Sequence, residues 1–205
     1  MIMIRYLVAV ALAALIGPSL AAQEVERIDG EKAGKAAKVL IPPTAKLPDV
    51  PFQLKPNVPH SLGFAIKKRA VFVIPDERLS ADAIAKAEQQ FVPLGVLYFV
   101  RIAPVVVESP LPGEKQRLVE VADGNDKTTV SVFYLATSNV AGRPVLLVYG
   151  KDKAPVLVTT LVDADEDRKV PVQLDALPGG GDSRATLLVT IGGRFRGAIQ
   201  LTTQD

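Results

Sequence analysis

The chain has no cysteine, no tryptophan and a single histidine among its 205 residues. Without cysteine it cannot form disulfides, thiol nucleophiles, Cys-ligated zinc sites or iron–sulfur clusters, and one histidine cannot build a multi-histidine metal site. An excess of one charge is also missing, because 24 Lys and Arg residues face 22 Asp and Glu residues. A nucleic-acid binder needs a clustered basic surface. The composition therefore argues against a nucleic-acid partner and indicates no cofactor.

The N-terminal residues 1–21 are typical of a secretory signal peptide. Arg5 supplies an early positive charge, an apolar run covers residues 6–16, and a Gly-Pro pair then leads to the small residues Ser19 and Ala21 at a cleavage point. The run of about 11 residues is too short for the ~20 that a membrane-spanning helix needs. We therefore expect a periplasmic or secreted protein with no transmembrane span after signal removal.

Residues 22–60 differ in composition from the rest of the chain and predict an arm or linker. A charged stretch comes first, and six prolines then lie between Pro42 and Pro59. Because proline fixes φ and pushes its predecessor into extended geometry, we expect polyproline-like or irregular structure. A solvated linker does not need apolar side chains, so those of the arm either pack along the body or dock on another protein. The candidate partner-binding residues here are Val39, Leu40, Ile41 and Phe52.

Residues 61–205 predict a mainly β domain. Short runs rich in Val, Leu, Ile, Phe and Tyr alternate with Gly, Pro and Asp, which is typical of an antiparallel sandwich or barrel. The expected strands are 64–74, 95–107, 117–122, 128–137, 144–149, 155–162, 169–175, 184–191 and 195–202. We predict an immunoglobulin-like β-sandwich of about seven to nine strands, preceded by the Pro-rich arm.

The last two expected strands permit a prediction of register. The odd-numbered positions are the more apolar ones in both 185–191 and 195–201. A two-residue glycine turn would set this apolar row against the arginines of the second strand, and a slip of one residue repairs the mismatch. We therefore predict that Ile191 lies opposite Phe195, across a three-residue loop or bulge with a glycine at positive φ.

One short helix, about residues 81–91, is expected to interrupt the strands. Ser80 is a favourable N-cap residue, and Leu79 and Ile84 occupy the two positions of a hydrophobic staple. Ile84 and Phe91 share the apolar face of this segment. We expect both side chains to point into the body.

Acidic residues at alternate positions, Asp163, Asp165 and Asp167, are the candidate metal ligands. On an extended segment they share one side and can offer oxygen ligands to Ca²⁺. The match to a calcium loop is poor, because Arg168 stands at the position of the loop glycine. A hairpin tip kept soluble by charge explains the segment more simply.

Arg194 and Arg196 are further candidates for partner binding, since they would project from one face of the last strand. They could contact an anionic glycan, a lipid headgroup or an acidic protein, although a solvated sheet face or a charged protective edge needs no ligand. His60, the only histidine, lies at the end of the proline arm. A catalytic triad needs a more rigidly held imidazole.

These observations favour an exported, non-catalytic binding or assembly module that acts through protein–protein contacts in the cell envelope. An alternative from a different class is a β-sandwich protein that binds a small ligand, a glycan or calcium. A hydrolase whose site has no recognisable pattern is a third hypothesis. Because fold alone does not determine function, the arm is the main positive indication of a protein partner.

Overall fold

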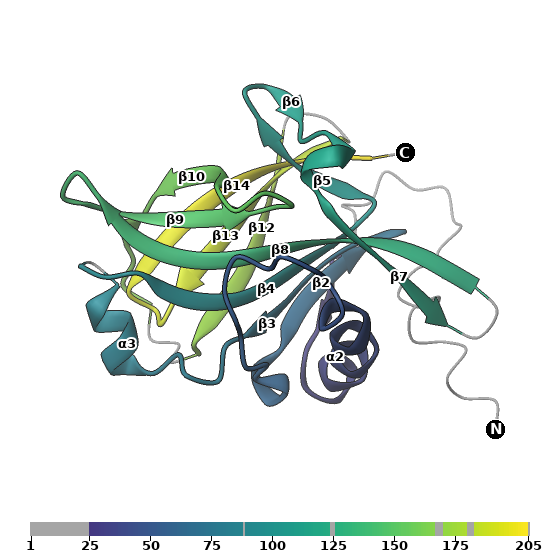
Figure 1. Ribbon diagram of the computed structural model, residues 1–205, viewed down its shortest axis with the longest axis horizontal. Helices are drawn as coiled ribbons and strands as arrows, with labels where there is room; N and C mark the ends of the chain where they lie inside the picture. The colour runs from purple at the N-terminus through teal and green to yellow at the C-terminus, as the bar shows by residue number, and fades with distance from the viewer. Residues whose placement is uncertain (1–24, 88, 124–125, 167–169, 180–182, 205) are drawn as a thin grey trace.

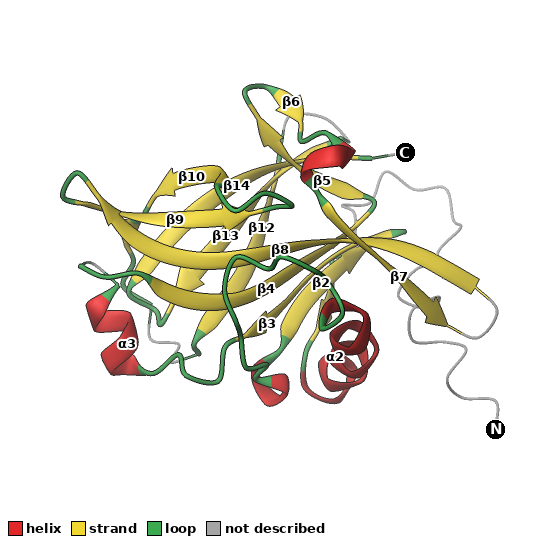
Figure 2. Cartoon of the chain, viewed as in Figure 1, coloured by secondary structure: helices red, strands yellow, loops and turns green. Residues whose placement is uncertain are grey.

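The computed structural model describes residues 25–87, 89–123, 126–166, 170–179 and 183–204. The predicted signal peptide lies outside these residues. The described chain is mainly β, with 54% strand arranged as two antiparallel sheets, as in a β-sandwich. Figures 1 and 2 show the strands of both sheets, with helices at the periphery.

The larger sheet, called sheet A, contains eight strands within the described residues. From one edge to the other it runs β1 (Glu26–Ile28), β2 (Leu62–Ile66), β3 (Arg69–Pro75), β4 (Val92–Val100), β8 (Asp126–Val140), β9 (Arg143–Tyr149) and β10 (Pro155–Thr160). The eighth strand, β7 (Arg117–Asp123), pairs with the N-terminal half of β8.

The smaller sheet, sheet B, contains six strands within the same residues. Its order is β12 (Val172–Pro178), β13 (Arg184–Ile191), β14 (Phe195–Thr203), β5 (Ile102–Val106) and β6 (Ser109–Pro110), and β11 (Val162–Asp163) pairs with β14. The described helices are α2 (Gly30–Thr44), α3 (Ala81–Lys86) and the single 3₁₀ turns η1 (Val58–His60) and η2 (Gly113–Lys115).

The first hydrophobic core lies between the two sheets. Phe99 and Phe133 of sheet A are fully buried, with their ring centroids 5.4 Å apart. Sheet B contributes Phe195, Ile199 and other odd-numbered residues of β13 and β14 to the same cluster. Because side chains alternate between the two faces of a strand, this period of two is what produces a shared core between sheets.

The C-terminal hairpin has the predicted register. Ile191 pairs with Phe195 across a three-residue loop, and the pairing continues without a shift to Arg184. Gly192 and Gly193 have φ values of 57° and 70°, which favour glycine. The apolar row of β13 therefore faces the apolar row of β14, and the prediction is confirmed.

Three of the expected strands are each two strands. Lys67, with a φ of 55°, turns the chain within the run 64–74 and separates β2 from β3. Arg101, with a φ of 54°, divides the run 95–107, and there the chain leaves sheet A and enters sheet B. The run 155–162 likewise divides into β10 and β11, which belong to different sheets. Neither Lys67 nor Arg101 is a usual turn residue, so hydrophobic patterning joined segments that the fold separates.

Helix α3 begins as the sequence predicts. The Ser80 hydroxyl accepts a hydrogen bond from the backbone N–H of Ala83 at 3.2 Å. Leu79 and Ile84 are both buried in the core between the sheets. The cap and the staple together fix where the chain enters the helix.

The end of α3 differs from the prediction. The helix stops at Lys86 rather than near Phe91, because β4 takes up the chain from Val92. Phe91 is 46% exposed instead of pointing into the body. Its ring contacts that of Phe52, with the centroids 5.3 Å apart.

The arm, here residues 25–60, contains a 15-residue helix that the proline-based prediction missed. Pro42 and Pro43 lie in the last turn of α2, after which the Ala45 N–H bonds to a helical carbonyl. Ala33 and Ala37 are buried against sheet A. Burial of an amphipathic face stabilises a helix more than local propensity does, and it outweighs the proline preference here.

Candidate functional site

The arm covers the outer face of sheet A, the face directed away from sheet B, and encloses a second hydrophobic core there. Phe52 stands at its centre, with its ring edge-on to Phe91, Tyr134 and Tyr149 at centroid distances of 5.3, 5.7 and 5.5 Å. Such edge-to-face pairs add to the energy of burial. The arm is thus packed on the body through its apolar residues.

Burial under the arm changes the ionisation of two tyrosines. It raises the pKa of Tyr98 above its usual value, and a hydrogen bond with Thr44 of α2 offsets only part of that effect. It also raises the pKa of Tyr134, against the opposing charge of Arg117. Both phenols therefore stay neutral well above physiological pH.

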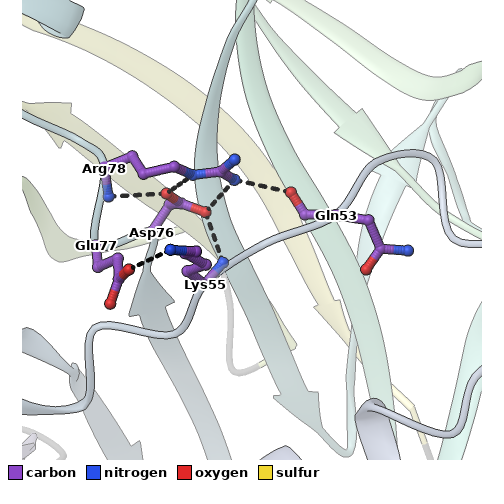
Figure 3. A network of polar contacts seen from close by, with 5 residues as sticks. All are labelled: Gln53, Lys55, Asp76, Glu77 and Arg78. Carbon is purple, nitrogen blue, oxygen red and sulfur yellow. Dashed lines mark hydrogen bonds and ion pairs between the residues drawn. The ribbon is translucent and has the colours of Figure 1, made fainter.

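A buried carboxylate anchors the arm at one end (Figure 3). Asp76, which is 1% exposed, accepts hydrogen bonds from the Lys55 N–H at 2.9 Å and from the Arg78 Nε and Nη2 at 2.7 and 2.8 Å. Arg78 Nη2 also donates to the Gln53 carbonyl at 2.8 Å. The contacts join β3 and the segment after it to the arm.

The same contacts set the ionisation of the Asp76 carboxyl. Burial alone would raise its pKa, but the hydrogen bonds from Arg78 and Lys55 and the charge of Arg78 outweigh burial. The pKa of Asp76 is therefore below its usual value. An ionised Asp76 is the state that holds the arm.

A buried arginine anchors the arm at a second place. Arg117 is 4% exposed and donates to the carbonyls of Pro48 at 2.8 Å and Asp49 at 2.6 Å, both in the arm. It also donates to the carbonyls of Gly150 at 2.7 Å and Lys151 at 2.8 Å, which follow β9. The five N–H groups of a guanidinium suit this bridging role. Arg117 thus ties the start of β7 to both the arm and the end of β9.

A groove of about 370 Å³ lies on the surface between α2 and β7. One wall is the C-terminal part of α2 and the residues after it, and the other is β7. We call this the α2–β7 groove, lined by Val39, Pro42, Pro43, Lys46, Leu47 and residues 118–122. Val39 is 37% exposed and Leu118 is 49% exposed. The groove is therefore open to solvent and has both apolar and polar groups in its lining.

The strand in this wall has a free edge. At residues 131 and 132, β8 pairs with β4 on one side and with β7 on the other. Farther along its length, β8 pairs with β9 on the same side as β7. The two-residue turn at Ala141 and Gly142 directs the backbone groups of even-numbered β8 residues to that shared side. Their partners in β7 are the odd-numbered residues.

It follows that the N–H and C=O groups of Leu118, Glu120 and Ala122 point away from β8. Within the described residues no other strand pairs with β7. Unpaired backbone groups on a sheet edge are a template for another extended chain. The groove thus combines an apolar wall with a row of available hydrogen-bonding groups.

The groove lining contains one acidic and one basic residue. The Glu120 carboxylate is paired with Lys127 Nζ at 3.3 Å. Lys46 of the opposite wall is exposed, and no ion pair of Lys46 is found within the described part of the chain. Within the described residues, Lys46 therefore leaves one positive charge without an ion-pair partner at its end of the groove.

The candidate partner-binding residues of the arm divide into two groups. Leu40, Ile41 and Phe52 pack against the core beneath the arm. Val39 instead lines the α2–β7 groove. Of the four, Val39 is the one whose side chain faces this open surface.

The acidic segment and the two arginines, which the sequence presents as separate sites, lie against each other. The N–H groups of Ala164 and Glu166 donate to the carbonyls of Arg194 and Gly193 at 2.7 and 3.1 Å. Arg196 forms an ion pair with Glu166. The guanidinium of Arg194 lies 4.9 Å from the centre of the Phe195 ring. Arg194, Arg196 and Glu166 thus make contacts within the chain.

The candidate metal ligands are only partly described. Asp163, in β11, and Asp165 are exposed, while Asp167 lies outside the described residues. The part of the chain that the structure describes holds no group of three acidic or histidine side chains placed for a metal. The Nδ1 atom of His60 lies 2.9 Å from the Asn57 side-chain oxygen.

The sequence does not predict a role for Leu118 or the free edge of β7. The segment 117–122 was predicted as a strand, but its partners come from β8 alone. Alternating apolar residues indicate a strand and do not tell an edge from a centre. The available signal was Leu118, an apolar residue on the face opposite the buried Val119.

The comparisons with known proteins give no match: no protein-family model fits the chain, and neither curated proteins nor solved structures include a similar one. The immunoglobulin-like connectivity therefore stays a prediction within the observed sandwich. Among the described helices, none has the length and apolar character needed to cross a membrane.

Proposed function

We propose that this chain is an exported, non-catalytic binding module that acts in the cell envelope, and that the α2–β7 groove is its contact surface for a protein partner. The observation that carries the proposal is the groove itself, where exposed Val39 and Leu118 flank the edge of β7, whose outward backbone groups have no strand partner among the described residues. The export part rests on the signal-like residues 1–21.

The packing of the arm supports a surface of this kind. Two polar anchors, at Asp76 and Arg117, and the aromatic cluster around Phe52 hold the arm on sheet A. The groove wall is therefore a fixed part of the fold and needs no ordering before a partner binds. A preformed surface lowers the entropic cost of association.

The experiment places a photo-crosslinking amino acid at Leu118 of the full chain in the cells that produce it. The matched control carries the same amino acid at Val158, which is 49% exposed on the edge strand β10. We expect a discrete adduct from Leu118 that is absent from Val158, in the envelope fraction of the cells. Equal labelling from both positions, or none from Leu118, would contradict the proposal.

A further inference from the structure

The proposed function leaves open what kind of chain the groove accepts. We propose, on the basis of that function, that the groove binds an extended segment of another protein as an added strand on β7, and that this segment carries acidic residues beside its apolar ones.

The backbone of β7 indicates an extended occupant. The outward N–H and C=O groups at the edge of β7, on the side away from β8, belong to Leu118, Glu120 and Ala122, which line the groove. A helix satisfies its own backbone groups and cannot use these, whereas an extended chain pairs with them as in β-strand addition. The groups are spaced along one seven-residue strand, so an occupant of similar length can be matched to them.

The walls indicate the side chains of the occupant. Residues of an added strand alternate between two faces, and one of these faces meets Val39, Pro42 and Leu47 of the opposite wall. These are apolar contacts, which favour apolar residues at alternate positions. Pro42 and Pro43 also cannot donate backbone hydrogen bonds, so the wall presents apolar rings rather than competing donors.

The charge of the groove indicates the acidic residues. Lys46 lies on the wall opposite β7, whereas the one acidic lining residue, Glu120, is paired with Lys127. An acidic side chain at the end of an occupant can therefore pair with Lys46.

The test measures binding of a synthetic seven-residue peptide, the length of β7, by fluorescence anisotropy with the full chain. The probe alternates valine and threonine and has a glutamate at each end. Two control peptides replace the glutamates by lysines or carry N-methyl groups on alternate backbone amides. We expect the acidic probe to bind more tightly than both, and equal binding of the N-methylated peptide would overturn strand addition.

A proline variant tests the strand edge directly. Glu120→Pro removes an N–H that points away from β8, so the β7–β8 ladder stays intact. The matched control is Val158→Pro, whose N–H points away from β9 on the edge of β10. We expect Glu120→Pro to weaken binding of the probe by about tenfold, because the probe loses its hydrogen bonding to this part of the strand edge. Val158→Pro should leave binding unchanged, and thermal melts check that both variants fold.

The charge is tested at Lys46. Lys46→Glu should weaken binding of the acidic probe and strengthen binding of the lysine probe, each by about two- to fivefold. The same sign of change for both probes would remove the acidic part of the proposal. A concentration-dependent dimer in light scattering that Glu120→Pro abolishes would identify a second copy as the occupant and overturn the inference.

These outcomes are separate from those of the proposed function. A crosslink at Leu118 together with no effect of Glu120→Pro leaves a binding module that does not use strand addition. No specific crosslink at Leu118 removes the binding surface and the strand together.

Discussion

The guanidinium of Arg78 holds the buried carboxylate of Asp76 with two hydrogen bonds, from Nε at 2.7 Å and from Nη2 at 2.8 Å, and its Nη2 also reaches the Gln53 carbonyl. One side chain therefore connects the strand β3 region to the arm. The carboxylate is covered on its other side by the Lys55 N–H. The arm depends on a charge that is inaccessible to solvent.

Replacing Asp76 tests this anchor. Asp76→Asn keeps the size of the side chain but removes the charge and turns one acceptor into a donor that faces Arg78. We expect the free energy of unfolding to fall by about 2–4 kcal/mol in urea titrations. The control is Glu77→Gln, which removes the exposed ion pair with Lys55 and should change stability by less than about 0.5 kcal/mol. Similar effects of the two variants would contradict the role of Asp76.

The lowered pKa of Asp76 predicts a dependence of stability on pH. A carboxyl with a pKa below its unfolded value stabilises the fold fully above that unfolded value, near 3.8, and the stabilisation is lost as pH falls through the folded value. The free energy of unfolding should therefore decrease below about pH 4. The free energy of unfolding of Asp76→Asn should decrease less over the same pH range, measured at the same salt concentration. Parallel curves for the two proteins would count against a lowered pKa.

We expect Arg117 to be more sensitive to replacement than Asp76, because its guanidinium donates hydrogen bonds to four backbone carbonyls. Arg117→Met removes all four hydrogen bonds to these carbonyls, so we expect the free energy of unfolding to fall by about 3 kcal/mol and proteolysis within residues 45–57 to become faster. The stability of Arg117→Lys should lie between those of the unmodified protein and Arg117→Met, since an ammonium group cannot reach all four acceptors. Arg143→Lys, at an exposed turn, is the control and should leave both measurements unchanged.

The features that could be read from the sequence depend on neighbouring segments. The pairing of Ile191 with Phe195 follows from two adjacent strands, whose apolar rows admit one register. The start of α3 follows from the cap at Ser80 and from its staple. In both cases the residues that decide the structure lie within about ten positions of one another.

The features that could not be read depend on contacts distant in sequence. Ala33 and Ala37 become a buried helix face only where sheet A exists to receive them, so the prolines of α2 misled the prediction. The free edge of β7 depends on where β9 stops, at Tyr149 opposite Tyr134. A single sequence does not contain that endpoint as a local pattern. The groove depends on both features, so it could not be predicted from the sequence.

The turn between β13 and β14 gives a test with a matched glycine. A Cβ at Gly192 would lie 2.6 Å from Ile84 Cδ1 of α3, and its φ of 57° disfavours other residues. We expect Gly192→Ala to reduce stability by about 1–3 kcal/mol. Gly34→Ala, inside α2 with no atom near the added Cβ, should instead stabilise by about 0.5–1 kcal/mol. Stabilisation by both changes would show that the turn is not constrained against α3.

The contact between Phe52 and Phe91 can be measured by a double-mutant cycle. Phe52→Ala removes three edge-to-face contacts and should cost about 3 kcal/mol, whereas Phe91→Ala, at a half-exposed ring, should cost about 1 kcal/mol. Because the two rings touch, we expect a coupling energy of about 0.5–1.5 kcal/mol in chemical denaturation. A cycle of Phe52 with Val107, an exposed residue between β5 and β6 of sheet B, should give a coupling near zero. If the Phe52–Phe91 coupling is equally small, then Phe91 does not help hold the arm, and its exposure reflects a side chain without a structural role there.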